Sequence, residues 1–251
     1  MHLVPTGQHL LLRHWFRPEL PGSLVWSHMA RTGRGRCLVD RWPNPRTVIA
    51  EVAGNYSLRG DATHLDDQPE PIAGFVEAPE EFLIELRRLD PDLFVWERVI
   101  LELNGGLRCP PAPAAVVRRL AAPDAGALAG LAEGISWISK TLGGPAGLAA
   151  SELGCGAFCG GQLASVAVPF FLGEDYEDLG VVTERAFRGR GLSAACAAAV
   201  VADICSRGRR PTWTASLNNV VSLGLARRLG FRPVREDRLY IMRTSVPGPD
   251  D

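Results

Sequence analysis

The second half of the chain changes repeatedly between short apolar runs and longer stretches with apolar residues three or four positions apart. Short runs bounded by turn residues predict strands, and the longer stretches predict helices. The predicted strands cover residues 116–120, a hairpin over about 155–170, 177–183, 211–216 and 239–243. The predicted helices cover about 125–132 (capped by Asp124), about 135–141, 192–206 and 220–229. Strands that alternate with helices favour a mixed or parallel sheet with covered faces.

The first half of the chain also mixes strand-like and helix-like segments. Residues 46–52 and 94–103 have the composition of strands, and the apolar positions of 79–89 recur with helical spacing before Asp90 and Pro91. We therefore expect an α/β fold here as well, although no catalytic motif is recognisable in this half.

A proline-rich segment predicts a boundary between the two halves. Residues 109–113 read CPPAP, and prolines this dense continue neither a helix nor a central strand. A length of 251 residues suits two modest domains. The expected organisation is an N-terminal α/β domain over 1–108, a linker over 109–113, a second domain over 114–246 and a frayed tail over 247–251.

Composition and charge exclude several classes of protein. A net charge of −1 gives no overall basic surface for nucleic acid or for an anionic membrane. Residues 153–173 carry no charge, but their glycines and a proline favour a buried hairpin over a membrane helix. No secretory signal is visible, and the cysteine spacing gives no zinc site. We expect a cytoplasmic protein with reduced thiols and no metal.

The segment with the clearest chemistry is Arg188-Gly189-Arg190-Gly191-Leu192-Ser193, between a predicted strand and a long helix. Glycines let the backbone approach a ligand closely, and the first N–H groups of a helix have no partner within it. The positive end of the helix dipole and two arginines add to this arrangement, which suits a pyrophosphate.

Several interpretations of this loop compete. A Walker P-loop is excluded, because its motif needs a lysine and Lys140 is the only lysine in the chain. Residues 189–194 fit the dinucleotide pattern GxGxx[GA], but residues 184–188 separate them from their strand, and the next strand, 211–216, lacks the expected acid. From the hexapeptide alone, an arginine-rich helix start without a ligand also stays open.

A second motif favours coenzyme A. RGRGLS resembles the [QR]xxGx[GA] acyl-CoA loop of the GNAT (Gcn5-related N-acetyltransferase) superfamily, and residues 213–231 resemble its later pattern, a strand followed by N-x-x-[SA] and a helix ending in LGF. The positions that match this second pattern are Asn219, Ser222, Leu229, Gly230 and Phe231. The resemblance covers residues 114–244, and GNYSLRGD at 54–61 suggests a subgroup with a smaller GNAT-like or α/β N-terminal domain.

The resemblance implies which residues hold acetyl-CoA as the cosubstrate. Its pantetheine arm would pair with a splayed strand, its pyrophosphate would bind the loop amides, and two residues of the next helix would face it. The strand residues are Val181, Val182 and Thr183. The loop residues are Arg188, Gly189, Arg190, Gly191, Leu192 and Ser193. The helix residues are Asn219 and Ser222.

The chain departs from the family pattern mainly in its acid–base groups, because an expected tyrosine is missing. Many members carry a tyrosine five residues before the final Phe of the motif, where this chain has Ala226. All five histidines lie in the first 64 residues, so none follows in the second half. Glu177 lies eleven residues before Arg188, the offset of the general base in the histone acetyltransferase branch, so it is the candidate base. Tyr176 and Tyr240 are the tyrosines of this half, and either could be the acid, with Tyr240 as the named candidate; a water chain to bulk solvent is the other alternative.

These observations lead to two hypotheses. The first is an acyl-CoA N-acyltransferase that transfers an acetyl group to a primary amine of a small molecule or peptide by direct attack. The second, which the missing tyrosine and histidine leave open, is a catalytically silent module that senses acyl-CoA or mediates assembly. Neither nucleic acid nor membrane is an expected partner, and the sequence identifies neither the acceptor nor the oligomeric state.

Overall fold

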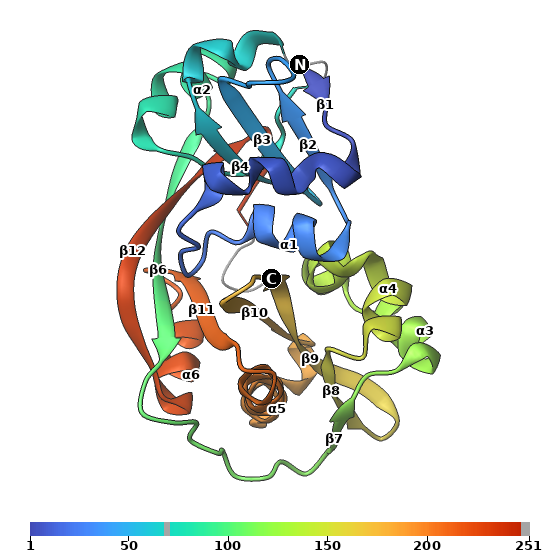
Figure 1. The fold of residues 1–251 in the computed structure, drawn as a ribbon. Helices are drawn as coiled ribbons and strands as arrows, with labels where there is room; N and C mark the ends of the chain where they lie inside the picture. The colour runs from blue at the N-terminus through green and yellow to red at the C-terminus, as the bar shows by residue number, and fades with distance from the viewer. Residues whose placement is uncertain (68–70, 247–251) are drawn as a thin grey trace.

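One mixed sheet of twelve strands runs through the computed structural model, which describes residues 1–67 and 71–246 (Figure 1). The strand order is β1-β2-β3-β4-β5-β12-β6-β11-β10-β9-β8-β7. The strands are β1 (His2–Leu3), β2 (Arg36–Val39), β3 (Thr47–Val52), β4 (Asn55–Gly60), β5 (Gly74–Glu77), β6 (Phe94–Leu103), β7 (Val116–Arg119), β8 (Cys155–Cys159), β9 (Gln162–Leu172), β10 (Tyr176–Thr183), β11 (Arg210–Ser216) and β12 (Phe231–Met242). This arrangement confirms the mixed α/β class expected from the sequence.

Helices cover both faces of the sheet. The α-helices are α1 (Val25–Thr32), α2 (Leu83–Leu89), α3 (Ala125–Ala129), α4 (Gly144–Ser151), α5 (Leu192–Ser206) and α6 (Val220–Leu229). The 3-10 helices are η1 (Thr6–Phe16), η2 (Ala62–Asp67), η3 (Glu80–Phe82), η4 (Ala122–Asp124), η5 (Glu133–Leu142) and η6 (Arg185–Phe187). In the second half, α5 and α6 pack on one face, and α3, α4 and η5 pack on the other. Alanines on the buried side of α5 let this helix lie close to the strands.

Strand β6 joins the two halves of the chain. It pairs antiparallel with β11 on one side and with β12 on the other, so a strand from the first half lies between two strands from the second (Figure 1). The predicted linker 109–113 follows β6 and leads to β7 at the far edge of the sheet. Hydrogen bonds therefore cross the predicted boundary, and the division into two domains stays a prediction.

Several predicted elements match the structure in position and type. Helices α5 and α6 and strand β6 have the expected limits, and the uncharged stretch 153–173 contains the antiparallel hairpin of β8 and β9. Strand β12 begins at Phe231, eight residues earlier than predicted, because its first part pairs with β6. The predicted tail 247–251 lies outside the described residues.

Asp124 does not cap α3 through its side chain, which corrects one prediction. Its carboxylate accepts the N–H of Ala121 at 2.9 Å and forms two hydrogen bonds of 2.7 Å with the Arg118 guanidinium. The 3-10 turn η4 precedes α3, so the carboxylate closes this turn instead.

Within residues 1–67 and 71–246, no helix has both the length and the apolar composition needed to span a bilayer.

Candidate functional site

Strands β10 and β11 separate partway along their length. They pair in parallel from Tyr176 opposite Arg210 to Leu179 opposite Trp213, where the described register ends. β10 then continues to Thr183 against β9, and β11 continues against β6. The register with β9 shifts at the point of separation, because Asp178 lies opposite Phe171 and Leu179 opposite Pro169; the extra residue, Phe170 of β9, forms a bulge there, and bulges bend strands. We call residues 180–183 of β10 and 214–216 of β11 the splay; its inner edges carry backbone groups that a bound chain-like molecule could pair with.

The loop after β10 begins at Thr183, the end of the splay, and leads to the N-terminus of α5. Gly189 and Gly191 have φ angles of +78° and +76°, and an added Cβ at either would meet no atom within 4 Å. Gly191 is the N-cap residue, so the next N–H groups of this 15-residue helix have no carbonyl partner within it. Open space beside free N–H groups and the positive end of a helix dipole suits an anion such as a pyrophosphate.

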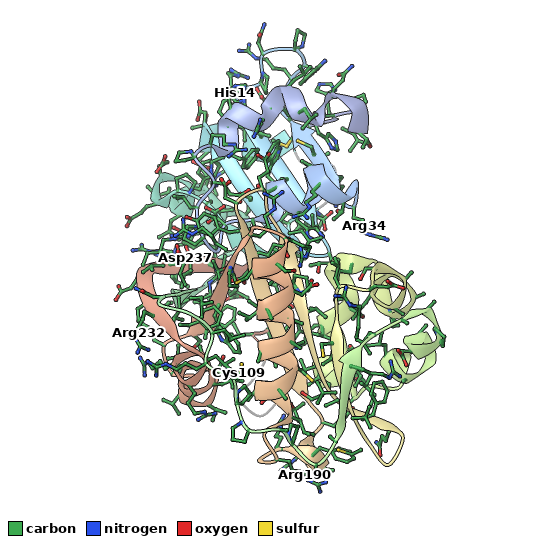
Figure 2. The ribbon with its side chains drawn as sticks, turned by 60° about the horizontal axis from the view of Figure 1, so that its bottom comes forward. His14, Arg34, Cys109, Arg190, Arg232 and Asp237 are labelled. Carbon is green, nitrogen blue, oxygen red and sulfur yellow. The ribbon has the colours of Figure 1, made fainter. Side chains whose placement is uncertain are left out.

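The two arginines of this loop are exposed and fixed to it. The Arg188 guanidinium Nε donates to the Thr183 carbonyl at 3.4 Å. The Arg190 guanidinium lies 5.1 Å from the centre of the Phe187 ring, a cation–π contact. Figure 2 shows Arg190 at the N-terminal end of α5. The loop thus brings positive charge to the helix end where the sequence predicts the pyrophosphate.

Asn219 and Ser222 shape the start of α6 beside the splay. The Asn219 side-chain oxygen accepts the N–H of Ser222 at 3.0 Å, so Asn219 caps the helix. The indole N–H of Trp213, a buried residue of β11, donates to the Ser222 hydroxyl at 2.9 Å. These contacts fix α6 against β11 and give both motif residues a structural role.

Glu177 is completely buried within an ion-pair network. Its Oε1 atom lies 2.9 Å from Nη1 of Arg31 in α1 and 2.6 Å from Nη1 of Arg207 at the end of α5. Leu179 and Val181, the next residues on the same face of β10, pack against α5. A carboxylate held by two guanidinium groups on the covered face does not support the predicted role as general base.

Tyr240 lies in a different part of the molecule. It is fully buried in the core of the first half with Leu58 and Phe82, on the part of β12 that pairs with β5. Burial raises the pKa of Tyr240. Tyr176 lies at the start of β10, where its hydroxyl accepts a hydrogen bond from Arg210 at 2.7 Å. Neither position supports the role of an acid at the splay.

Asp178 presents a second carboxyl on the opposite face of β10. It is 7% exposed, and its Oδ1 accepts hydrogen bonds from the hydroxyls of Thr212 at 2.6 Å and Thr214 at 3.0 Å. Burial raises the pKa of Asp178, although both hydroxyls favour the ionised form. The distance of eleven residues from Arg188 points to Glu177 as the general base and does not point to Asp178. Strand alternation places the two carboxyls on opposite faces, but the sequence does not show which face α5 covers.

Residues from the first half fix the turn that leads into β10. The Glu19 carboxylate accepts the backbone N–H groups of Glu174 at 2.9 Å, Asp175 at 2.8 Å and Tyr176 at 3.1 Å. Burial opposes ionisation of Glu19, but these hydrogen bonds outweigh it, so its pKa is lowered. No local pattern in the sequence indicates this contact.

His28 in α1 connects this helix to the second half. Its Nδ1 accepts the N–H of Leu172 at 3.0 Å, so Nε2 carries the proton and donates to the Thr141 carbonyl at 3.0 Å. Burial lowers the pKa of His28 to about 4, and the positive charges of Arg34 and Arg31 act in the same direction. The neutral imidazole is therefore a structural connection between α1, η5 and β9.

A loop from the first half covers the sheet face close to Asp178. A Cβ added at Gly22 would lie 2.2 Å from Cδ1 of Ile100 and 3.6 Å from the Thr214 hydroxyl, so the backbone approaches the strands closely there. Arg235 of β12 holds this loop, since its side chain donates to the Pro21 carbonyl at 3.0 Å and to the Ser23 hydroxyl at 3.2 Å.

Comparison with known proteins agrees with this geometry. The family model described as GNAT acetyltransferase matches residues 140–240. An uncharacterized N-acetyltransferase in the mutA 5' region of Streptomyces virginiae is 40% identical over 200 residues, which cover 77% of this chain and 84% of that protein.

Two solved structures have the same fold over nearly the whole chain. The first is a GCN5-related N-acetyltransferase-like protein from Streptococcus suis, with a TM-score of 0.73, 17% identity and coverage of 94% of this chain and 98% of that one. The second is an acetyltransferase from the GNAT family of Colwellia psychrerythraea, with a TM-score of 0.58, 12% identity and coverage of 95% and 97%. The similarity therefore includes the first half of the chain.

Proposed function

Because the chain belongs to the GNAT family of N-acetyltransferases, we propose that it transfers an acetyl group from acetyl-CoA to a primary amine of a small molecule or peptide by direct attack. The observation that carries the proposal is the splay between β10 and β11, followed directly by the glycine loop and the N-terminus of α5. A strand edge for a chain-like amide and a helix end for a pyrophosphate occur in the order in which coenzyme A presents these groups.

In this proposal, each part of acetyl-CoA has its own group of residues. The pyrophosphate binds the amides of residues 188–193 and the two arginines there, and the pantetheine arm pairs with Val181, Val182 and Thr183. Asn219 and Ser222 hold α6 beside the cofactor. The open positions at Gly189 and Gly191 support this placement, because a ligand can approach their backbone without meeting a side chain.

Direct attack is supported by the side chains on the open part of β10. Residues 180–182 are glycine and valines, and the Thr183 hydroxyl is engaged by the Ser165 hydroxyl at 2.7 Å. None of these groups is an activated nucleophile that would form an acyl-enzyme. The amine itself would therefore attack the thioester.

Two measurements test the proposed function. Titration calorimetry with acetyl-CoA measures binding, and thiol release from acetyl-CoA with a panel of primary amines measures transfer. The panel should contain polyamines, aminoglycosides, lysine and short peptides with a free N-terminus. The proposal expects binding together with amine-dependent thiol release. Binding without release across the panel would instead support the silent acyl-CoA sensor or assembly module.

A further inference from the structure

Two cysteines of the second half face each other between the sheet and α5. Cys155 of β8 and Cys196 of α5 belong to one buried core cluster, with exposures of 5% and 0%. Their thiols lie in hydrogen-bond contact. Both cysteines are free, so the cluster holds two adjacent thiols that can react with one another.

The two thiols differ from a thiol that is only buried. Burial raises the pKa of Cys37, in the core of the first half, to about 12. The pKa of Cys155 is instead lowered, because the hydrogen bond with Cys196 favours its thiolate and outweighs burial, and nearby arginine charges act in the same direction. The same contact and burial raise the pKa of Cys196. Cys155 is therefore the nucleophile of the pair, and Cys196 keeps its proton.

An exposed side chain at the edge of the sheet covers Cys155. Arg119 of the edge strand β7 lies opposite Cys155 in the antiparallel register. Its guanidinium donates to the Asp203 carboxylate of α5 at 2.7 Å and to the Glu152 carbonyl at 2.8 Å, and its side chain is 56% exposed. A small uncharged oxidant therefore reaches Cys155 when this one side chain moves aside.

Cys196 is close to the groups that the proposed function assigns to acetyl-CoA. It lies five residues after Gly191, the N-cap of α5. Its thiol donates to the Ser165 carbonyl at 3.8 Å, and the Ser165 hydroxyl bonds the Thr183 hydroxyl at 2.7 Å. A covalent S–S bond is shorter than a hydrogen-bond contact between thiols, so forming it draws the start of α5 towards β8 and removes the donor to Ser165.

We propose that Cys155 and Cys196 form a redox switch: a peroxide joins them in a disulfide, which weakens acetyl-CoA binding at the start of α5, and a thiol reductant restores it. Formation of the disulfide is independent of the proposed function, and its effect on acetyl-CoA rests on that function.

The oxidation balances in two steps. The Cys155 thiolate attacks one oxygen of hydrogen peroxide, and the O–O bond breaks to leave a sulfenic acid and hydroxide, which takes up a proton to give water. The Cys196 sulfur then attacks the sulfenic sulfur, the S–O bond breaks and the S–S bond forms. The Cys196 proton and the leaving hydroxide give a second water. The two thiols lose two electrons, and one peroxide is reduced to two waters.

Peptide mapping tests whether the disulfide forms. Trypsin releases the pair in two peptides, 141–185 and 191–207, which also contain Cys159 and Cys205. The protein used therefore carries Cys159→Ser and Cys205→Ser, so that a link between these peptides joins only Cys155 and Cys196. After hydrogen peroxide and alkylation of the remaining free thiols, we expect linked peptides that separate on reduction. Separate peptides after peroxide would overturn the inference.

Titration calorimetry with acetyl-CoA tests the effect of the disulfide. We expect peroxide to lower the affinity of the wild type about tenfold, within the usual range of coupling between two sites, and dithiothreitol to restore it. Cys155→Ala and Cys196→Ala each remove one thiol and should bind acetyl-CoA equally before and after peroxide. Cys205→Ser is the matched control, because Cys205 is an exposed cysteine of α5 and its replacement retains the pair.

The outcomes separate this inference from the proposed function. Linked peptides with unchanged affinity would overturn the switch, and so would an equal loss of affinity in the alanine variants. If one alanine variant does not fold, the other gives the same comparison. A reduced wild type that does not bind acetyl-CoA would overturn the proposed function and the effect on binding with it, while the linked peptides would still decide whether the disulfide forms.

Discussion

The carboxylate of Glu19 accepts the backbone N–H of Asp175 at 2.8 Å, across 156 positions of sequence. The same carboxylate accepts two neighbouring N–H groups, so one side chain of the first half holds the entire entry into β10. The strand that carries the splay is therefore positioned from outside the segment that bears the family motifs.

Replacing Glu19 should destabilise the protein without touching the cofactor loop. In Glu19→Gln, an amide NH2 faces backbone N–H donors that had a carboxylate oxygen. We expect the free energy of unfolding to fall by about 2 kcal/mol, as measured by urea denaturation. Glu97→Gln is the matched control, because Glu97 is exposed and its replacement should change stability little. Equal stability of the two variants would contradict the anchoring role.

His28 should make stability depend on pH in a definite window. Its pKa is about 4 in the folded protein and about 6.5 in an unfolded chain, so the unfolded state binds more protons between these values. The contribution of neutral His28 to the free energy of unfolding is complete above pH 6.5 and is lost as the pH falls from there towards 4. Urea denaturation at several pH values should show this loss in the wild type and a flatter profile in His28→Gln.

The control for His28 is the exposed histidine of η1. His14→Gln should retain the wild-type slope, because this side chain is in solvent. Equal slopes for His28→Gln and the wild type between pH 4 and 6.5 would show that His28 titrates normally. The pKa of Asp40 is also lowered, to about 2, but its contribution is lost below pH 4 and does not overlap this window.

Gly191 can be tested against Gly208, which lies just beyond the other end of α5. Both have positive φ angles, +76° and +72°, and neither has an atom within 4 Å of an added Cβ. An alanine at either site should cost about 1 kcal/mol of backbone strain. Only Gly191→Ala should also weaken acetyl-CoA binding in calorimetry, by about tenfold, because its methyl group would lie where the pyrophosphate approaches. Equal affinities of the two variants would argue against the proposed pyrophosphate position.

Substitutions at Asn219 can show whether this residue acts by capping α6 or by contacting acetyl-CoA directly. Asn219→Ala removes the acceptor for the Ser222 N–H and should lower the free energy of unfolding by about 1 kcal/mol. Asn219→Ser, which also caps helices well, should restore stability and acetyl-CoA affinity together. A serine variant that is stable but binds acetyl-CoA as weakly as Asn219→Ala would show that the amide contacts the cofactor itself.

The elements around the cofactor loop could be predicted because their signals are local. The Ala-rich run of α5, the Asn219 cap and Gly230 after α6 each define a helix limit within a few residues. The pairing of β6 with β11 and β12 could not be predicted, since strand order depends on contacts far apart in sequence. Helix α1 was not predicted either, because its residues are held by packing against first-half strands and by the contacts of His28 with Leu172 and Thr141, which no local pattern shows.

The choice between the two carboxyls shows where the site prediction reached its limit. Position relative to Arg188 selects Glu177, and this inference uses sequence distance alone. The partners of that side chain, Arg31 and Arg207, come from helices on either side of it in sequence. Ion pairing and the face of β10 on which each side chain lies therefore distinguish Glu177 from Asp178, and neither property appears in the order of residues.

The location of β6 has a consequence for the newly synthesised chain. This strand pairs with β11 and β12, which are the last two strands to be made. Until residues 210–242 leave the ribosome, β6 has open edges on both sides, and β5 lacks its β12 neighbour. Such edges can pair with other chains. Early protection by a chaperone would thus matter more for this protein than for one whose halves close their sheets one after the other.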